Sequence, residues 1–142
     1  MIKIRGEIQK GLGAAKNTIQ IQKPFLRQYL SEIESCHDGT INVLLEQPLI
    51  IFSPDIVTPP IFWLSQNNSI SEEFGFLKIK LEILNKSICV DAWIYIAYKS
   101  PHYANPFYIE IIAPYIDIQN ASMCSIIIDK GNIKELASIV IE

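Results

Sequence analysis

Short apolar runs, in the first of which hydrophobic and charged residues alternate, recur along the chain and predict a mostly-β fold. Ile2, Ile4 and Ile8 alternate with charged residues, which is the pattern of a half-buried strand. Two longer runs, 74–84 and 87–98, flank a two-residue polar turn and predict a long hairpin. Further strands are expected over 18–21, 40–45, 49–52, 61–64, 107–112 and 123–128.

One helix interrupts this pattern. Pro24 suits the first position of a helix, and the residues after it are apolar at helical spacing. These apolar residues are Phe25, Leu26, Tyr29, Leu30 and Ile33. The segment 35–39 ends the helix, and a short closing helix is expected over 132–140. Many short strands with one embedded helix predict a closed or nearly closed barrel, which removes exposed sheet edges.

The composition limits the size and the class of the fold. The chain has 142 residues, of which 49% are hydrophobic, so residues 1–142 are expected to form one domain with an ordinary core. Net charge is −3 and the basic residues are scattered, which argues against a nucleic-acid partner. The sequence leaves both a monomer and a small homo-oligomer open.

Location and redox state are also constrained by the sequence. The longest apolar candidate, 92–98, is far shorter than the roughly 20 residues of a transmembrane helix, so no membrane association is expected. The first residues lack a signal-peptide pattern, which favours the cytoplasm. Three cysteines without CxxC spacing argue against a disulfide framework and a zinc site. Cys89 and Cys124 lie in apolar runs and are expected to be core thiols.

A loop of small residues is expected between the first strand and residue 18. Gly11 and Gly13 permit positive φ and close backbone approach, so successive amide groups can point at a di- or triphosphate. Lys16 is the nearest cation, and no Gly-Lys-Ser or Gly-Lys-Thr follows, so this is not a Walker A loop. The alternative is a plain strand connector.

Thr40 and Asn42 offer two neutral oxygen ligands. They are two residues apart on a predicted strand, so both side chains face the same side. A hydroxyl and an amide oxygen suit magnesium, which takes few protein ligands when phosphate oxygens supply others. The alternative is a turn-to-strand junction in which Thr40 caps the turn made by Gly39.

Four segments in order resemble the CTP-dependent riboflavin kinases, an archaeal-type enzyme family, across roughly residues 3–128. The last of them, Glu-Ile-Ile-Ala-Pro, matches the family directly. Ordered motifs in a chain of the right length are much harder to obtain by chance than single ones. The segments are 6–16, 38–43, 91–93 with 99–103, and 110–114.

The resemblance implies a six-stranded cradle-loop (RIFT-type) β-barrel and a set of site residues. Thr40 and Asn42 would hold Mg²⁺, and Ser100 and Glu110 would contact the flavin, with Glu110 as the candidate catalytic residue. Nucleotide contacts are implied for Leu12, Gly13, Ala14, Ala15, Lys16, Asn17, Tyr115, Ile116, Asp117 and Ile118. The expected reaction transfers the γ-phosphoryl of CTP to the 5′-hydroxyl of riboflavin, giving FMN and CDP.

The sequence departs from the family pattern at the glycine loop and near the flavin residues. The family usually has another glycine near Ala15, an arginine or similar residue nearby, and an aromatic residue at the position of Asn17. Two extra residues also separate Ser100 from Glu110. These departures keep open a relative that binds flavin or nucleotide without phosphoryl transfer. A regulatory cradle-loop barrel is the third alternative. If the resemblance is set aside, the alternative interpretation of Glu110 is an outward-facing charged residue on a strand.

Overall fold

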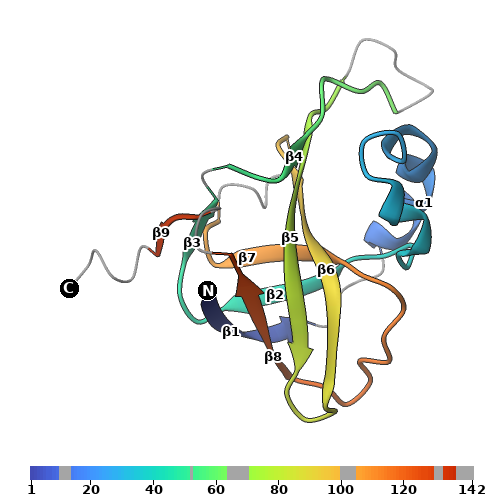
Figure 1. Cartoon of the computed structure of the whole chain (residues 1–142). Helices are drawn as coiled ribbons and strands as arrows, with labels where there is room; N and C mark the ends of the chain where they lie inside the picture. The colour runs from blue at the N-terminus through green and yellow to red at the C-terminus, as the bar shows by residue number, and fades with distance from the viewer. Residues whose placement is uncertain (10–13, 52, 64–70, 100–104, 130–132, 137–142) are drawn as a thin grey trace.

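A computed structural model describes residues 1–9, 14–51, 53–63, 71–99, 105–129 and 133–136, with the backbone alone for 14–17 and 133–136. Its centre is a closed antiparallel barrel of six strands in the order β5-β6-β7-β2-β1-β8, which closes where β8 pairs with β5 (Figure 1). The six strands are β1 Ile2–Gln9, β2 Ile41–Leu45, β5 Phe74–Ile83, β6 Ile88–Ala97, β7 Tyr108–Ile112 and β8 Met123–Ile128. The prediction of a mostly-β barrel is therefore confirmed.

Three short strands lie outside the barrel circuit. Strand β4, Ile56–Val57, pairs with Gly75 and Phe76 of β5, outside the part of β5 that pairs with β8. Strands β3, Leu49–Ile51, and β9, Ile133–Leu136, form a separate two-stranded sheet. That sheet lies on the opposite side of the barrel from the helix (Figure 1).

The barrel interior is a continuous apolar core. On β5, Leu77, Ile79, Leu81 and Ile83 point inward, and the charged residues between them point outward. Phe76, the neighbour of Leu77, points to the opposite face of β5, where it belongs to a second apolar cluster outside the barrel. The long hairpin predicted over 74–98 is confirmed, and its register pairs Phe74 with Ala97 through to Ile83 with Ile88.

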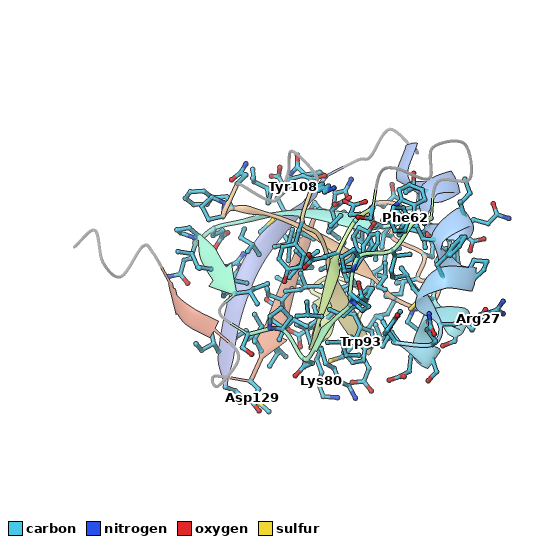
Figure 2. The ribbon with its side chains drawn as sticks, turned by 90° about the horizontal axis from the view of Figure 1, so that it is seen from above. Arg27, Phe62, Lys80, Trp93, Tyr108 and Asp129 are labelled. Atoms are coloured by element: carbon cyan, nitrogen blue, oxygen red, sulfur yellow. The ribbon has the colours of Figure 1, made fainter. Side chains whose placement is uncertain are left out.

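Helix α1, Ala14–Leu26, covers the outer face of β5, β6 and β7, and the 3-10 helix η1, Ser31–Ser35, follows it. Their buried residues pack on strand residues of the second cluster. Trp93 belongs to this cluster and lies between the strands and the helix (Figure 2). The strand residues in the cluster are Phe74, Phe76, Trp93, Tyr95, Ala97 and Ile112.

The predicted helix start is wrong, because α1 begins ten residues before Pro24 and ends two residues after it. Residues 14–17 are its first turn and not a loop, and 18–21 is helix and not strand. Ile19 is 1% exposed and Ile21 is 50% exposed. A strand would put these two side chains on one face, whereas a helix turns them about 200° apart, so the difference in exposure follows from the helix.

The structure also differs from the predictions at the C-terminal segment, at residues 61–64 and at Cys89. Residues 133–136 form strand β9, so the predicted closing helix is wrong there, and the rest of 132–140 lies outside the described residues. Of the predicted strand 61–64 the structure describes residues 61–63, and among these only Ile61 makes a bridge, to Glu72. Cys89 is exposed and is not a core thiol, because it lies on the outward face of β6 opposite Glu82. In the part of the chain that is described, no helix is long and apolar enough to cross a membrane.

Candidate functional site

The strand register brings two of the predicted residues, Asn42 and Glu110, into one row that crosses four strands. Gln9 at the end of β1 pairs with Asn42 on β2, Asn42 pairs with Glu110 on β7, and Glu110 pairs with Tyr95 on β6. Direct partners in antiparallel strands point to the same face, and adjacent strands lie about 5 Å apart. Because Tyr95 faces the cluster under α1, the whole row lies on the helix side of the barrel.

Thr40 and Asn42 are in direct contact. The Thr40 hydroxyl Oγ1 donates a hydrogen bond to Asn42 Oδ1 at 2.9 Å, which confirms that the two side chains share a face. Octahedral magnesium binds oxygens at about 2.0–2.1 Å, which places neighbouring ligand oxygens about 2.9 Å apart. The two oxygens therefore already have the separation of adjacent magnesium ligands. No cluster of three His, Cys, Asp or Glu side chains suited to a metal occurs among the described residues. Thr40 and Asn42 themselves offer only uncharged oxygen atoms as ligands.

A small cavity of about 210 Å³, lined mostly by residues with polar side chains, opens between α1 and this row. Helix α1 supplies one wall with Thr18 and Gln22, one turn apart, and the strands supply the opposite wall. The cavity is lined by Thr18, Ile19, Gln22, Thr40, Trp63, Glu72, Tyr95, Ala97 and Glu110. The predicted metal ligand Thr40 and the predicted catalytic Glu110 thus share one space.

A larger cavity of about 340 Å³ lies on the other side of the same strand residues. Its walls are mainly apolar, with Tyr98 and Tyr108 at its side and β3 forming another wall. Tyr98 occupies space left by Gly75, since a Cβ atom there would lie 2.7 Å from the Tyr98 hydroxyl. Figure 2 shows Tyr108 at the edge of the barrel. The lining is Leu49, Ile50, Ile51, Ile94, Tyr95, Ile96, Ala97, Tyr98, Asn105, Pro106, Tyr108, Ile109 and Glu110.

Glu110, Tyr95 and Ala97 line both cavities, so they form the boundary between them. The Tyr95 hydroxyl donates to Gln22 Oε1 at 2.8 Å, which ties this boundary to α1. Burial is the main cause that raises the pKa of Tyr95, with the charges of Glu72 and Glu110 adding to it. Burial and the charge of Glu110 also raise the pKa of Tyr108. Both phenols therefore stay protonated at neutral pH and act as neutral donors.

The turn before β2 is anchored to α1. Lys23 Nζ lies 2.8 Å from Asp38 Oδ1 and donates to the Cys36 carbonyl at 2.6 Å. The amide of His37 donates to the carbonyl of Ala113 at 2.8 Å, which joins the same turn to the segment after β7. These contacts fix the start of β2 and with it the position of Thr40.

The predicted nucleotide segment 115–118 has mixed surroundings. Tyr115 is 72% exposed and its ring stacks edge-on against His37 at 5.4 Å between centroids, close to the start of β2. Ile116 and Ile118 pack against the barrel core, and Asp117 Oδ1 accepts a hydrogen bond from the amide of Gln119. Tyr115 and Asp117 are both exposed, and Tyr115 is the one whose ring contacts His37 beside the predicted site.

Several predicted residues lie beyond what the structure describes. Leu12, Gly13 and Ser100 fall in undescribed segments, and for Ala14, Ala15, Lys16 and Asn17 only the helical backbone is described. The undescribed residues 10–13 connect Gln9, in the row, to the first turn of α1.

The sequence analysis missed Gln22, Glu72 and Tyr95. Gln22 is 1% exposed and lies between Ile19 and Leu26 on the buried face of α1, a position that helical periodicity would have revealed had the helix been placed correctly. Tyr95 is internal to an apolar strand, and Glu72 lies between the predicted strands 61–64 and 74–84, so neither carried a local signal.

Comparison with known proteins adds no family to these observations. No family model matches the chain, and no curated protein matches it significantly.

Proposed function

We propose that the protein is a magnesium-assisted phosphotransferase that moves the γ-phosphoryl of CTP to the 5′-hydroxyl of riboflavin, giving FMN and CDP. One observation carries the proposal: a carboxylate, Glu110, stands between a cavity lined mainly by aliphatic and aromatic residues and one lined mainly by residues with polar side chains, and the Thr40–Asn42 oxygen pair lies beside it. A transfer between two substrates needs two adjoining spaces and a group at their junction.

The larger cavity suits the ring system of the flavin. Its aliphatic walls and the two tyrosines Tyr98 and Tyr108 provide apolar and aromatic contact area for a flat heterocycle. With the ring there, the ribityl chain reaches past Glu110 into the small cavity, where its terminal hydroxyl would lie near Thr40. Glu110 would accept the proton of that hydroxyl as its oxygen forms the new bond to phosphorus. The bond between the γ-phosphorus and the β-bridging oxygen breaks, and CDP leaves.

The nucleotide would approach from the side of β1 and the helix start. Thr40 and Asn42 would hold Mg²⁺, which when bound neutralises phosphate charge, and the amides of the first turn of α1 favour a neighbouring anion. The exposed Tyr115 beside His37 offers an aromatic edge near the same opening. In this arrangement β2 and the start of α1 would bind the phosphoryl donor, and Glu110 and the larger cavity would bind the phosphoryl acceptor.

The test is an assay of purified protein with riboflavin, magnesium and each nucleoside triphosphate in turn, with FMN measured by chromatography. The proposal predicts FMN formation with CTP. Absence of FMN with every donor would contradict it. If riboflavin or CDP still bound in calorimetry, the protein would instead be a binding relative without transferase activity.

A further inference from the structure

A second carboxylate, Glu72, lines the small cavity together with Glu110. It lies outside all the segments that carry the family resemblance. Two backbone hydrogen bonds fix its position, because the Glu72 amide donates to the Ile61 carbonyl at 3.0 Å and the Ile61 amide donates to the Glu72 carbonyl at 2.9 Å. The carboxylate is oriented as well, since Trp63 Nε1 donates to Glu72 Oε1 at 3.2 Å.

The small cavity has the chemistry of a site for a neutral molecule rich in hydroxyl groups. Its two carboxylates accept hydrogen bonds, and Gln22, Thr40 and Tyr95 add neutral polar groups. The charges of Glu72 and Glu110 would repel an anionic group that carries no cation with it. Hydroxyl groups, in contrast, donate to carboxylates in strong charge-assisted hydrogen bonds.

We infer that Glu72, held by Trp63, is a specificity-determining residue that accepts hydrogen bonds from the hydroxyl groups of the acceptor's polyol chain. The inference rests on the proposed function and extends it. Glu110 and Glu72 then have different roles: Glu110 stands at the boundary of both cavities and acts on the terminal hydroxyl, whereas Glu72 lines only the small cavity and holds the chain. The acceptor is selected by its polyol as well as by its ring.

The experiment compares two flavins that share the ring but differ in the chain. Riboflavin carries the polyol, and lumiflavin has a methyl group in its place. Binding of each is followed by flavin fluorescence, which needs no turnover. The variant Glu72→Gln keeps an oxygen for the Trp63 indole to donate to but loses the charge, and Glu73→Gln is the matched control, because Glu73 is exposed and is not among the cavity residues.

Glu72→Gln should weaken riboflavin binding by about tenfold or more, the usual effect of losing a hydrogen bond to a charged group, and leave lumiflavin binding unchanged. Trp63→Phe should weaken riboflavin binding less, since it removes only the donor that orients the carboxylate. Glu73→Gln should bind both flavins like the wild type. Far-ultraviolet circular dichroism and the thermal midpoint confirm that each variant folds.

Three outcomes overturn the inference while leaving the proposed function in place. These are an equal loss for both flavins, no loss for either, and a raised magnesium requirement in turnover with unchanged riboflavin affinity. The last would make Glu72 part of the metal site. If the wild-type protein binds riboflavin no better than lumiflavin, the polyol role is also refuted. If the wild type binds neither flavin, the proposed function fails as well.

Discussion

At the residue scale, the useful information lies in pairs that the register brings together. Thr40 and Asn42 were predicted to share a face because they are two apart on a strand, and their 2.9 Å hydrogen bond confirms it. The pairing of Asn42 with Glu110 could not be predicted in this way, because it depends on strand β2 lying next to strand β7 in the sheet. Local patterns carry no information on such a long-range register.

Asn42→Ala should abolish FMN formation and leave the fold intact. The substitution removes one of two adjacent oxygens proposed for Mg²⁺, and Asn42 is only half-buried at the end of the ladder, so little packing is lost. The FMN assay measures the effect, and the thermal midpoint checks the fold. Asn85→Ala, in the exposed β5–β6 turn, is the control of the same residue type. Retained turnover in Asn42→Ala would reject the metal assignment.

The three thiols should differ in reactivity. Burial raises the pKa of Cys36 and of Cys124 from 9.0 to about 11, whereas Cys89 is exposed. Alkylation requires the thiolate, so at pH 8 Cys89 should be labelled much faster than the other two. Mass spectrometry after a short pulse of iodoacetamide identifies the labelled site. Equal labelling of all three in the folded protein would contradict the buried positions of Cys36 and Cys124.

The same thiols predict how stability responds to alkaline pH. The unfolded chain releases these protons near pH 9, but the folded chain retains them until about pH 11. The folded state therefore binds more protons in this window, so the free energy of unfolding should fall as pH rises from 9 to 11. Urea unfolding at a series of pH values measures the trend. Replacing both Cys36 and Cys124 with alanine should make the fall between pH 9 and 10 shallower, whereas the raised pKa of Tyr95 and of Tyr108 keeps part of the fall above pH 10.

At the element scale, strands were easier to predict than the helix. The strands over 74–84, 87–98 and 123–128 were predicted from apolar runs rich in β-branched and aromatic residues, and most of each run is buried in the structure. The helix was misplaced because Pro24 suggested a start, and the alternation of Ile19 and Ile21 resembled a strand. Packing against the barrel favours a helix instead, because Ile19, Gln22 and Leu26 then form one buried stripe. The wall that α1 gives to the small cavity was therefore missed together with the start of the helix.

Lys23→Met should loosen α1 from the turn that positions Thr40. Lys23 is 15% exposed, pairs with Asp38 and donates to the Cys36 carbonyl, and methionine keeps the length without the charge. The expected loss is about 1–3 kcal/mol of unfolding free energy, because polar groups lose a charged donor in a partly buried site. Urea unfolding provides the measurement. Arg27→Met is the control, since the pair of Arg27 with Glu34 is exposed and should contribute little.

At the scale of the whole molecule, barrel closure determines stability and holds the site together. The row of Gln9, Asn42, Glu110 and Tyr95 exists only because four strands are held side by side. The sequence favoured a closed barrel from the number of short strands, and the structure has one. Strand order and the position of each cavity follow from pairings between distant segments, which composition and periodicity do not encode.

Leu81→Ala should strongly destabilise the protein. Leu81 is 0% exposed in the barrel interior, so the change leaves a cavity and is expected to cost about 2–5 kcal/mol. Leu84→Ala, three residues further along at a position that is 40% exposed, should cost much less. Comparing urea midpoints of the two variants measures the difference. Similar losses at both positions would argue against the barrel core as described.

Strand β8 pairs with both β1 and β5, and this has a consequence for the timing of biosynthesis. A ribosome makes β1 first, but the partner on one of its edges begins only at Met123. At about 5–20 residues per second, that edge of β1 waits several seconds for its partner. During the wait two strand edges are available to other chains. Growing chains of this protein thus depend on protection from one another until the last barrel strand has emerged.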